Sequence, residues 1–257
     1  MEKRRGYISA VLFAVFVLTA GFSGAAQQPA PAERPARDIN ERWRAEQIEP
    51  LVETLESESR SIYRERNLLA AIAGPLPGAV VADVGAGSGF MTLLFARMVG
   101  PQGKVYAVDI NPRLLDYIRT RAQQQGLENI QTILAGEKDS RLPPNSVDLV
   151  FICDTYHHFE YPRETLASIH RALKPGGQLI LVEFHRHEGH SPNWVLEHVR
   201  GNQQQFVNEI TAAGFELINQ HNLAQIPDNY ILRFRKLERP QAASRLRYHG
   251  LRSQPVD

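Results

Sequence analysis

Short apolar runs alternate with longer amphipathic segments through the middle of the chain. The apolar runs have the length of single strands, and they lie at residues 80–84, 104–109, 130–134, 147–152 and 178–184. Strands that alternate with helices are typical of βαβ units, in which parallel strands are buried on both faces and read as unbroken apolar runs. The pattern therefore predicts an α/β domain built on a parallel sheet.

The intervening segments carry helix start and stop signals. The segment 90–99 has helical periodicity and is closed by Gly100 and Pro101. Asn111 and Pro112 provide an N-cap and a first helical residue for the next helix, and Pro162 begins another. These signals place a helix after each of the first, second and fourth apolar runs.

The pattern changes at both ends of this region. A helix ending at Ala213 precedes two runs at 215–220 and 230–236, which we expect to pair as an antiparallel edge of the sheet. The segment 38–73 is helical by period and charge, and we expect it to pack across the top of the sheet. The predicted domain spans residues 38–237.

The first residues have the pattern of a secretory signal peptide. A basic head at residues 3–5 precedes an uncharged, mostly apolar stretch over 6–22, and small residues occupy 23–26. We therefore predict that residues 1–26 direct export to the periplasm or the extracellular space. An uncleaved membrane anchor is the alternative, because the stretch has nearly the length that spans a bilayer.

The composition predicts the nature of the terminal segments and excludes some classes of partner and site. The Pro- and Ala-rich residues 27–37 predict a stiff linker, and residues 238–257 predict a flexible basic tail. Lys and Arg number 29 against 28 Asp and Glu, so no strong field favours a nucleic-acid partner. The single cysteine, Cys153, excludes an internal disulfide and a multi-cysteine metal site.

A glycine-rich loop follows the first strand and opens a helix. Its sequence, DVGAGSG over 83–89, lets the backbone approach a ligand closely at a helix N-terminus. Phe90 stands where a dinucleotide-binding fingerprint has its third glycine. Asp83, at the end of a buried strand, suits a cationic amino group better than a pyrophosphate; alternatively, it braces the turn.

A second acid ends the second strand. Asp109 lies twenty residues after Gly89, where a carboxylate accepts both hydroxyls of a ribose. The alternative is that its charge only complements the N-terminus of the helix that begins at Pro112.

Four motifs in order resemble the class I S-adenosylmethionine-dependent methyltransferases. They are DVGAGSG, VYAVDIN, SVDLVFICD and ALKPGGQLILVEF, and the resemblance covers about residues 50–237. The segments ESESRSIY (56–63) and DTYHHF (154–159) resemble an exported subgroup of this family. The resemblance implies a Rossmann-like, doubly wound, seven-stranded sheet, mostly parallel with an antiparallel edge strand and preceded by N-terminal helices. It also implies S-adenosylmethionine as the methyl donor.

The resemblance implies roles for the loop and its acids. Asp83 would support the methionine end of the donor, Asp109 would bind its ribose, and Glu137 or Asp139 would lie near the adenine, although the usual Gly-Asp-Ala is absent. The predicted cofactor contacts are Asp83, Gly85, Ala86, Gly87, Gly89, Asp109, Ile110, Glu137, Asp139, Asp154, Arg60 and Tyr63.

The candidate catalytic residues follow the fourth strand. Ligands of open α/β sheets lie at the carboxyl ends of the strands, and methyl transfer needs positioning and a deprotonated acceptor. We expect His157 or His158 to act as base or to orient the acceptor, Asp154 to position cofactor or substrate, and Tyr156 to shape the methyl pocket. A histidine base of ordinary pKa would give activity that rises through about pH 6.5.

A metal site is the alternative use of the histidines after the fifth strand. His185, His187 and His190 lie near Glu183 and Glu188, but nothing in this spacing supplies a full ligand geometry, so we predict no metal.

The predicted function is methyl transfer from S-adenosylmethionine to a small-molecule acceptor that the sequence does not identify. The alternatives are a protein that kept the fold and binds S-adenosylmethionine without turnover, and a nicotinamide-linked oxidoreductase. The sequence shows no nucleic-acid patch and no lipid-binding helix. If the signal peptide is cleaved, we expect no stable membrane insertion.

Overall fold

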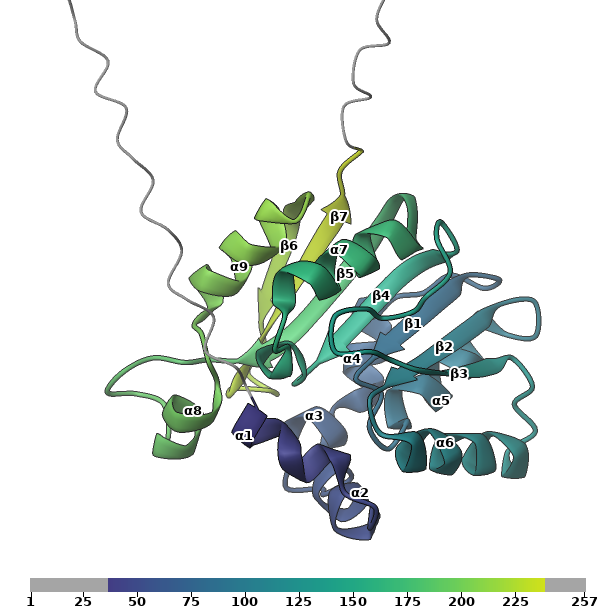
Figure 1. Cartoon of the computed structure of the whole chain (residues 1–257), viewed down its shortest axis with the longest axis horizontal. Coiled ribbons are helices and arrows are strands. Elements are labelled where there is room, and N and C mark those ends of the chain that lie inside the picture. The colour runs from purple at the N-terminus through teal and green to yellow at the C-terminus, as the bar shows by residue number, and fades with distance from the viewer. Residues whose placement is uncertain (1–36, 239–257) are drawn as a thin grey trace, which may run out of the picture. The chain divides into compact units, whose positions relative to one another are not determined.

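A computed structural model describes residues 37–238 (Figure 1). The predicted signal peptide, the predicted linker up to residue 36 and the tail from residue 239 lie outside the described residues. Arg37, the last residue of the predicted linker, begins the first helix. Within the described part of the chain, no helix is both long enough and apolar enough to cross a membrane.

The centre of the fold is a sheet of seven strands in the order β3-β2-β1-β4-β5-β7-β6. The strands are β1 (Val80–Val84), β2 (Lys104–Asp109), β3 (Ile130–Leu134), β4 (Val147–Cys153), β5 (Leu173–Phe184), β6 (Phe215–Asn222) and β7 (Asn229–Lys236). Strands β1 to β5 pair in parallel, and β7 pairs antiparallel with both β5 and β6. The predicted mostly parallel, Rossmann-like sheet is confirmed, and the antiparallel strand β7 lies one position inside the edge strand β6.

Helices cover both faces of the sheet, as a doubly wound fold requires. These helices include α5 (Phe90–Val99), α6 (Pro112–Gln124), α7 (Pro162–Ala172) and α9 (Gln203–Ala212), whereas α8 (Asn193–His198) lies beyond the carboxyl end of β5 (Figure 1). Along β2, Tyr106 and Val108 pack into the same core as α7 and α9, whereas Val105 packs into the core beneath α5. Alternate strand residues therefore bury opposite faces, and Figure 1 shows α7 and α9 on one face with α4 and α5 on the other.

The N-terminal helical segment is divided into short pieces: α1 (Arg37–Asn40), the 3-10 helix η1 (Glu41–Arg44), α2 (Glu49–Leu55), α3 (Ser61–Arg64) and α4 (Arg66–Ala73). The pieces α1 to α3 lie beyond the carboxyl ends of the parallel strands (Figure 1). The helix α4 instead packs on a sheet face beside α5, because Leu69, Ala70 and Ala73 give it a buried apolar side. The prediction that the whole segment crosses the top of the sheet is wrong for α4.

The structure can be compared with the sequence predictions at two element boundaries near the site, the start of α6 and the start of β5. Asn111 caps α6 as predicted, since its side chain accepts a hydrogen bond from the Arg113 amide at 2.8 Å. The fifth strand, expected over 178–184, begins earlier, at Leu173, and its register with β4 shifts between Val147 and Leu149. The strand order reverses between β1 and β4, which opens a crevice at their carboxyl ends.

Candidate functional site

A cavity lies at the carboxyl ends of β1, β2 and β4, where the strand order reverses. Trp43 and Arg44 of η1, and Leu55 of α2, form its cover on the side away from the sheet. The remaining lining comes mainly from the segments after the strands: 83–87, 108–110, 135–137 and 153–155. The predicted cofactor loop and the loop after β4 therefore open onto one space.

The glycines of the loop have different roles. Gly85 and Gly87 line the cavity, and a Cβ at Gly85 would lie 2.1 Å from the Thr155 side chain, so only glycine fits there. Gly89 does not line the cavity. It has a φ of 81° at the N-cap of α5, and a Cβ would lie 2.5 Å from Ile118. Gly89 thus allows α5 to pack against α6, and its predicted cofactor contact stays a prediction that the lining of the cavity does not support.

Asp83 is a buried acid at the end of β1. Its side chain is 3% exposed, lines the cavity and accepts a hydrogen bond of 2.6 Å from the Thr92 hydroxyl. Burial, with a contribution from the negative charge of Asp109, raises the pKa of Asp83 to about 7. This hydrogen-bond partner lies on α5 and not in the glycine turn, so the turn-bracing alternative is not what this geometry shows.

Asp109 holds the glycine loop and the start of α6 together. One carboxylate oxygen accepts from the Gly87 amide and the other from the Asn111 amide, both at 2.9 Å. Burial raises the pKa of Asp109, while these amide bonds oppose the rise. The carboxylate lines the cavity beside Ile110 with unused lone pairs, so the geometry is compatible with ribose binding as well as with a structural role.

The two acids predicted near the adenine separate. Glu137 lines the cavity, and its carboxylate lies 3.6 Å from the Arg44 guanidinium. Asp139 does not line the cavity, because its two oxygens accept from the Arg141 amide and the Arg171 side chain. The structure therefore retains Glu137 and excludes Asp139 as a cavity residue.

Arg60 and Asp154 join the N-terminal helices to the sheet. The Arg60 guanidinium donates to Asp154 at 2.8 Å and to the Leu55 carbonyl, and Asn229 of β7 donates to the other Asp154 oxygen at 2.7 Å. Asp154 has a φ of 47°, and burial raises its pKa to about 6 despite the arginine. Both Arg60 and Asp154 line the cavity as predicted.

Tyr63 is not at the cavity. Its ring packs edge-on against Phe90, with centroids 5.4 Å apart, and the Arg66 guanidinium lies over it at 4.2 Å. Phe90 itself lines the cavity, so Tyr63 supports a lining residue and is not a cofactor contact.

Tyr156 also faces away from the cavity. Its side chain is fully buried, its hydroxyl donates to Glu209 at 2.8 Å, and Arg200 lies 5.0 Å from its ring. The short 3-10 helix η2 (Tyr156–His158) directs consecutive side chains differently, and it directs Tyr156 toward α9. The predicted role of Tyr156 in shaping a methyl pocket therefore has no support from the lining of the cavity.

The two candidate bases differ in environment. His157 is 1% exposed and does not line the cavity, and its Nδ1 lies 2.9 Å from both carboxylate oxygens of Glu183. His158 does line the cavity, and its Nδ1 lies 2.8 Å from Asn40 Oδ1. Burial and the neighbouring His157 and His198 lower the pKa of His158 to about 2. A cavity base of ordinary pKa, as the sequence predicted, is therefore not found at His158.

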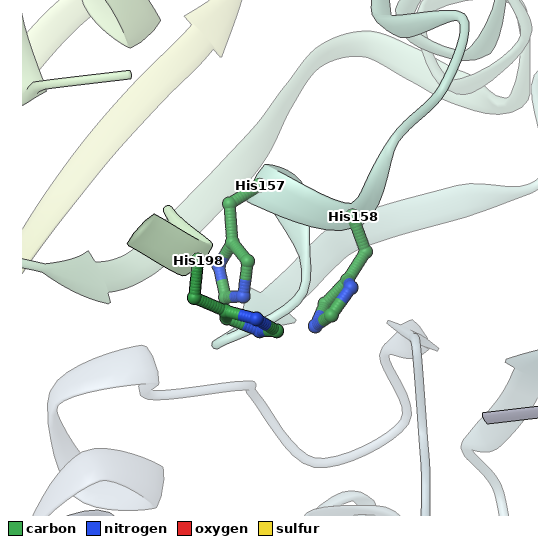
Figure 2. Close-up of side chains that lie close together, drawn as sticks. All are labelled: His157, His158 and His198. Atoms are coloured by element: carbon green, nitrogen blue, oxygen red, sulfur yellow. The ribbon is translucent and has the colours of Figure 1, made fainter. Parts of the chain in front are cut away.

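The sequence prediction missed residues from outside the motifs. His198 ends α8 and lies beside both histidines of η2, with ring centroids 5.1 Å from His157 and 5.0 Å from His158 (Figure 2). Burial and the nearby charges lower its pKa to about 4. Trp43 also lines the cavity. Both lie in short helices whose sequences carry no ligand-binding pattern, so no sequence signal distinguished them.

The residues after β5 form a separate group. His185 and His187 stack with centroids 5.7 Å apart, and His187 and His190 line a second, shallow hollow. Glu183 turns inward to His157 and does not join them. Within residues 37–238, the histidines that come together in a metal-ligand arrangement are instead His157, His158 and His198.

Cys153 is half-buried at the end of β4 and lines the cavity. Burial and nearby carboxylates raise the pKa of its thiol well above the usual value, so the thiolate is disfavoured.

Part of the chain is similar to a known protein family. Residues 82–181 match the family model described as a methyltransferase domain. This part, which carries the glycine loop and strands β1 to β4, is therefore similar to methyltransferase domains. The match ends before β7 and begins after the N-terminal helices.

Similar proteins align with this chain over different lengths. The ubiquinone/menaquinone biosynthesis C-methyltransferase UbiE of Ectopseudomonas mendocina is 36% identical over 114 residues, which are 44% of each chain. The protein of the same name from Stutzerimonas stutzeri is 26% identical over 181 residues, covering 59% of this chain and 71% of the relative. A solved structure of a SAM-dependent methyltransferase from Aquifex aeolicus has a TM-score of 0.63 at 24% identity, covering 72% of this chain and 97% of that one. The chain thus spans less than half of the first of these curated relatives.

Proposed function

We propose that this protein transfers a methyl group from S-adenosylmethionine to a small-molecule acceptor. The observation that carries the proposal is the single cavity in which Asp83 and Asp109 stand on either side of the glycine loop. An acid that suits an ammonium group and an acid that suits ribose hydroxyls are thereby presented to one ligand. The methyltransferase match over residues 82–181 supports this choice over a nicotinamide-linked oxidoreductase.

The residues present fit this donor. Trp43 Nε1 and Thr165 Oγ1 line the cavity and are buried without a hydrogen-bond partner among the described residues, so a polar ligand would satisfy them. Asp83 would hold the amino group, Asp109 the ribose and Glu137 the adenine end. When bound, S-adenosylmethionine supplies a methyl group already activated by its positive sulfur.

The chain contributes positioning and exclusion of water. Trp43 and Leu55 cover the cavity, and the Arg60–Asp154 ion pair fixes the cover to β4. Asp154 and His158 line the cavity on the β4 side, where we place the acceptor. With its pKa near 6, Asp154 is the cavity group better suited to accept a proton at neutral pH, whereas His158 is suited to orient the acceptor. We carry over the donor of the curated relatives and not their acceptor.

The test is calorimetric titration of the purified chain with S-adenosylmethionine, S-adenosylhomocysteine and NAD. We expect both sulfur compounds to bind and NAD not to bind. Asp109→Ala should weaken S-adenosylhomocysteine binding tenfold or more, because two charge-assisted hydrogen bonds are each worth about 1.5–3 kcal/mol. Binding of NAD alone would contradict the proposal. Donor binding without methyl transfer to any acceptor would favour the binding protein without turnover.

We also propose that residues 1–26 direct export. The support is the sequence pattern of a basic head, an apolar stretch and small residues at the exit. Mass spectrometry of the protein from the exporting cell should find a new N-terminus near Gln27. Full-length protein in the membrane fraction would instead indicate an uncleaved anchor.

A further inference from the structure

Three histidine rings from two distant segments meet beside the cavity. His157 and His158 come from η2, His198 comes from the end of α8, and Figure 2 shows their rings converging on a common space. One ring nitrogen of each lies within 4.8 Å of the others. Neutral imidazole nitrogens do not attract one another, so this convergence calls for a cation or a donor between them.

Hydrogen bonds fix which nitrogen of His157 is free. Its Nδ1 lies 2.9 Å from both oxygens of Glu183, which is 0% exposed. A carboxylate only accepts hydrogen bonds, so Nδ1 carries a proton, and in the neutral ring Nε2 then holds the lone pair that a metal ion needs. A carboxylate behind a histidine in this way is the usual second partner of a metal-binding imidazole.

Asn40 fixes His158 in the same sense. The Asn40 amide nitrogen donates to the His158 carbonyl at 2.9 Å and to Glu160 at 3.0 Å, which orients the amide. Its oxygen then accepts from His158 Nδ1 at 2.8 Å, so Nε2 of His158 also keeps a lone pair. His198 makes ring contacts but no hydrogen bond within residues 37–238, so its ring is free to turn.

We propose that His157, His158 and His198 bind a divalent transition-metal ion of the zinc type. Imidazole nitrogen is a preferred ligand of zinc and its neighbours, whereas Mg²⁺ and Ca²⁺ prefer oxygen. Zinc lies about 2.0–2.1 Å from each nitrogen, which places two tetrahedral ligands about 3.4 Å apart. The three nitrogens lie within 4.8 Å of one another in the metal-free chain, so binding requires the rings to turn inward, and the half-buried His198 ring is the one that no hydrogen bond holds within residues 37–238.

The location of the site indicates what a bound ion would do. Three protein ligands leave one zinc position open, and His158 is the member of the trio that lines the cavity. The open position therefore lies toward the side where Asp154 also lines the cavity. If the proposed function holds, this position takes an oxygen, nitrogen or sulfur atom of the acceptor and fixes it for transfer. Metal binding itself does not depend on that function.

The experiment uses the chain purified without a polyhistidine tag and stripped with a chelator. Calorimetry with Zn²⁺ should show one equivalent bound, and Co²⁺ should give the visible absorption bands of a tetrahedral nitrogen site. His198→Ala should weaken Zn²⁺ binding about a hundredfold or more, since loss of an outer partner alone typically costs 10–100-fold. His198 is half-buried at a helix end, so this variant removes little of the core.

The matched control is His187→Ala with His190→Ala, which removes two histidines of the separate hollow. This control should bind Zn²⁺ as the parent chain does. Absence of stoichiometric binding in the parent chain overturns the inference, and so does equal affinity in His198→Ala or loss of binding in the control. Titration with S-adenosylhomocysteine on the same samples separates the two proposals. If the chain binds Zn²⁺ but not S-adenosylhomocysteine, the proposed function is contradicted and the metal site is supported.

Discussion

Asp83, which we propose to hold the amino group of the donor, destabilises the ligand-free protein when its carboxylate is charged. Its pKa rises from 3.8 in the unfolded chain to about 7 in the folded chain, so the folded state holds the proton more tightly. A raised carboxyl pKa favours the folded state below about pH 4, and this contribution is lost as the pH rises through 7. At pH 8 the buried charge therefore opposes folding.

Asp83→Asn should raise the free energy of unfolding at pH 8 by about 2–4 kcal/mol and change it little at pH 3. The amide occupies the same space without a charge. Urea denaturation of the ligand-free chain at both pH values measures the difference. Glu53→Gln, on the exposed side of α2, is the control and should change neither value. Equal effects of Asp83→Asn at the two pH values would contradict the raised pKa.

The same acid should couple donor binding to pH. A bound ammonium group favours the carboxylate, so binding below pH 7 releases the proton that Asp83 holds. Affinity for S-adenosylhomocysteine should rise about tenfold per pH unit below 7 and level off above it. Calorimetry in buffers of low and high ionisation enthalpy counts the released proton. In Asp83→Asn the affinity should be weaker and the release absent.

At the scale of elements, the strands could be predicted because their signal is local. Each of β1 to β4 is an apolar run that ends at a turn signal, and the Asn111 cap also depends only on nearby residues. The glycine loop and Asp109 were predictable for the same reason. The directions of Tyr156, His157 and His158 were not, because η2 is fixed by its contacts with α9, Glu183 and Asn40. Sequence adjacency placed all three at the cavity, whereas packing leaves only His158 lining it.

The cover of the cavity depends on an ion pair between elements. Arg60→Ala should destabilise the protein by about 1–3 kcal/mol, less than the 3–5 kcal/mol of a fully buried pair, because the Arg60 side chain is 23% exposed. Hydrogen exchange of residues 49–64 should increase more than that of the sheet. Arg64→Ala, which removes an exposed pair with Glu65, is the matched control. Unchanged exchange in Arg60→Ala would mean that the cover is held by other contacts.

At the scale of the whole molecule, β7 completes two parts at once. Tyr230, Ile231, Leu232 and Phe234 are each at most 1% exposed, and Asn229 donates to Asp154 in the cavity. Burial of four such side chains is worth about 6–12 kcal/mol, which is comparable with the whole stability of a domain. The last strand therefore supports both the core and the site.

A chain that ends after residue 228 should not fold cooperatively, whereas a chain that ends after residue 238 keeps every described contact and should fold. Circular dichroism during thermal unfolding distinguishes the two. A cooperative transition in the shorter chain would show that β6 can pair directly with β5 in the absence of β7.

The position of β7 in the sheet also determines the order in which the strands can pair during synthesis. During synthesis β6 emerges before β7, yet in the sheet β7 lies between β5 and β6. Until β7 has emerged from the ribosome, β6 has no partner strand and β5 has an open edge. The sheet thus stays incomplete until its seventh strand is available, and a chain in that state is the form that a translocation channel for unfolded proteins accepts. If the proposed export holds, the late arrival of β7 favours passage of the chain before it folds.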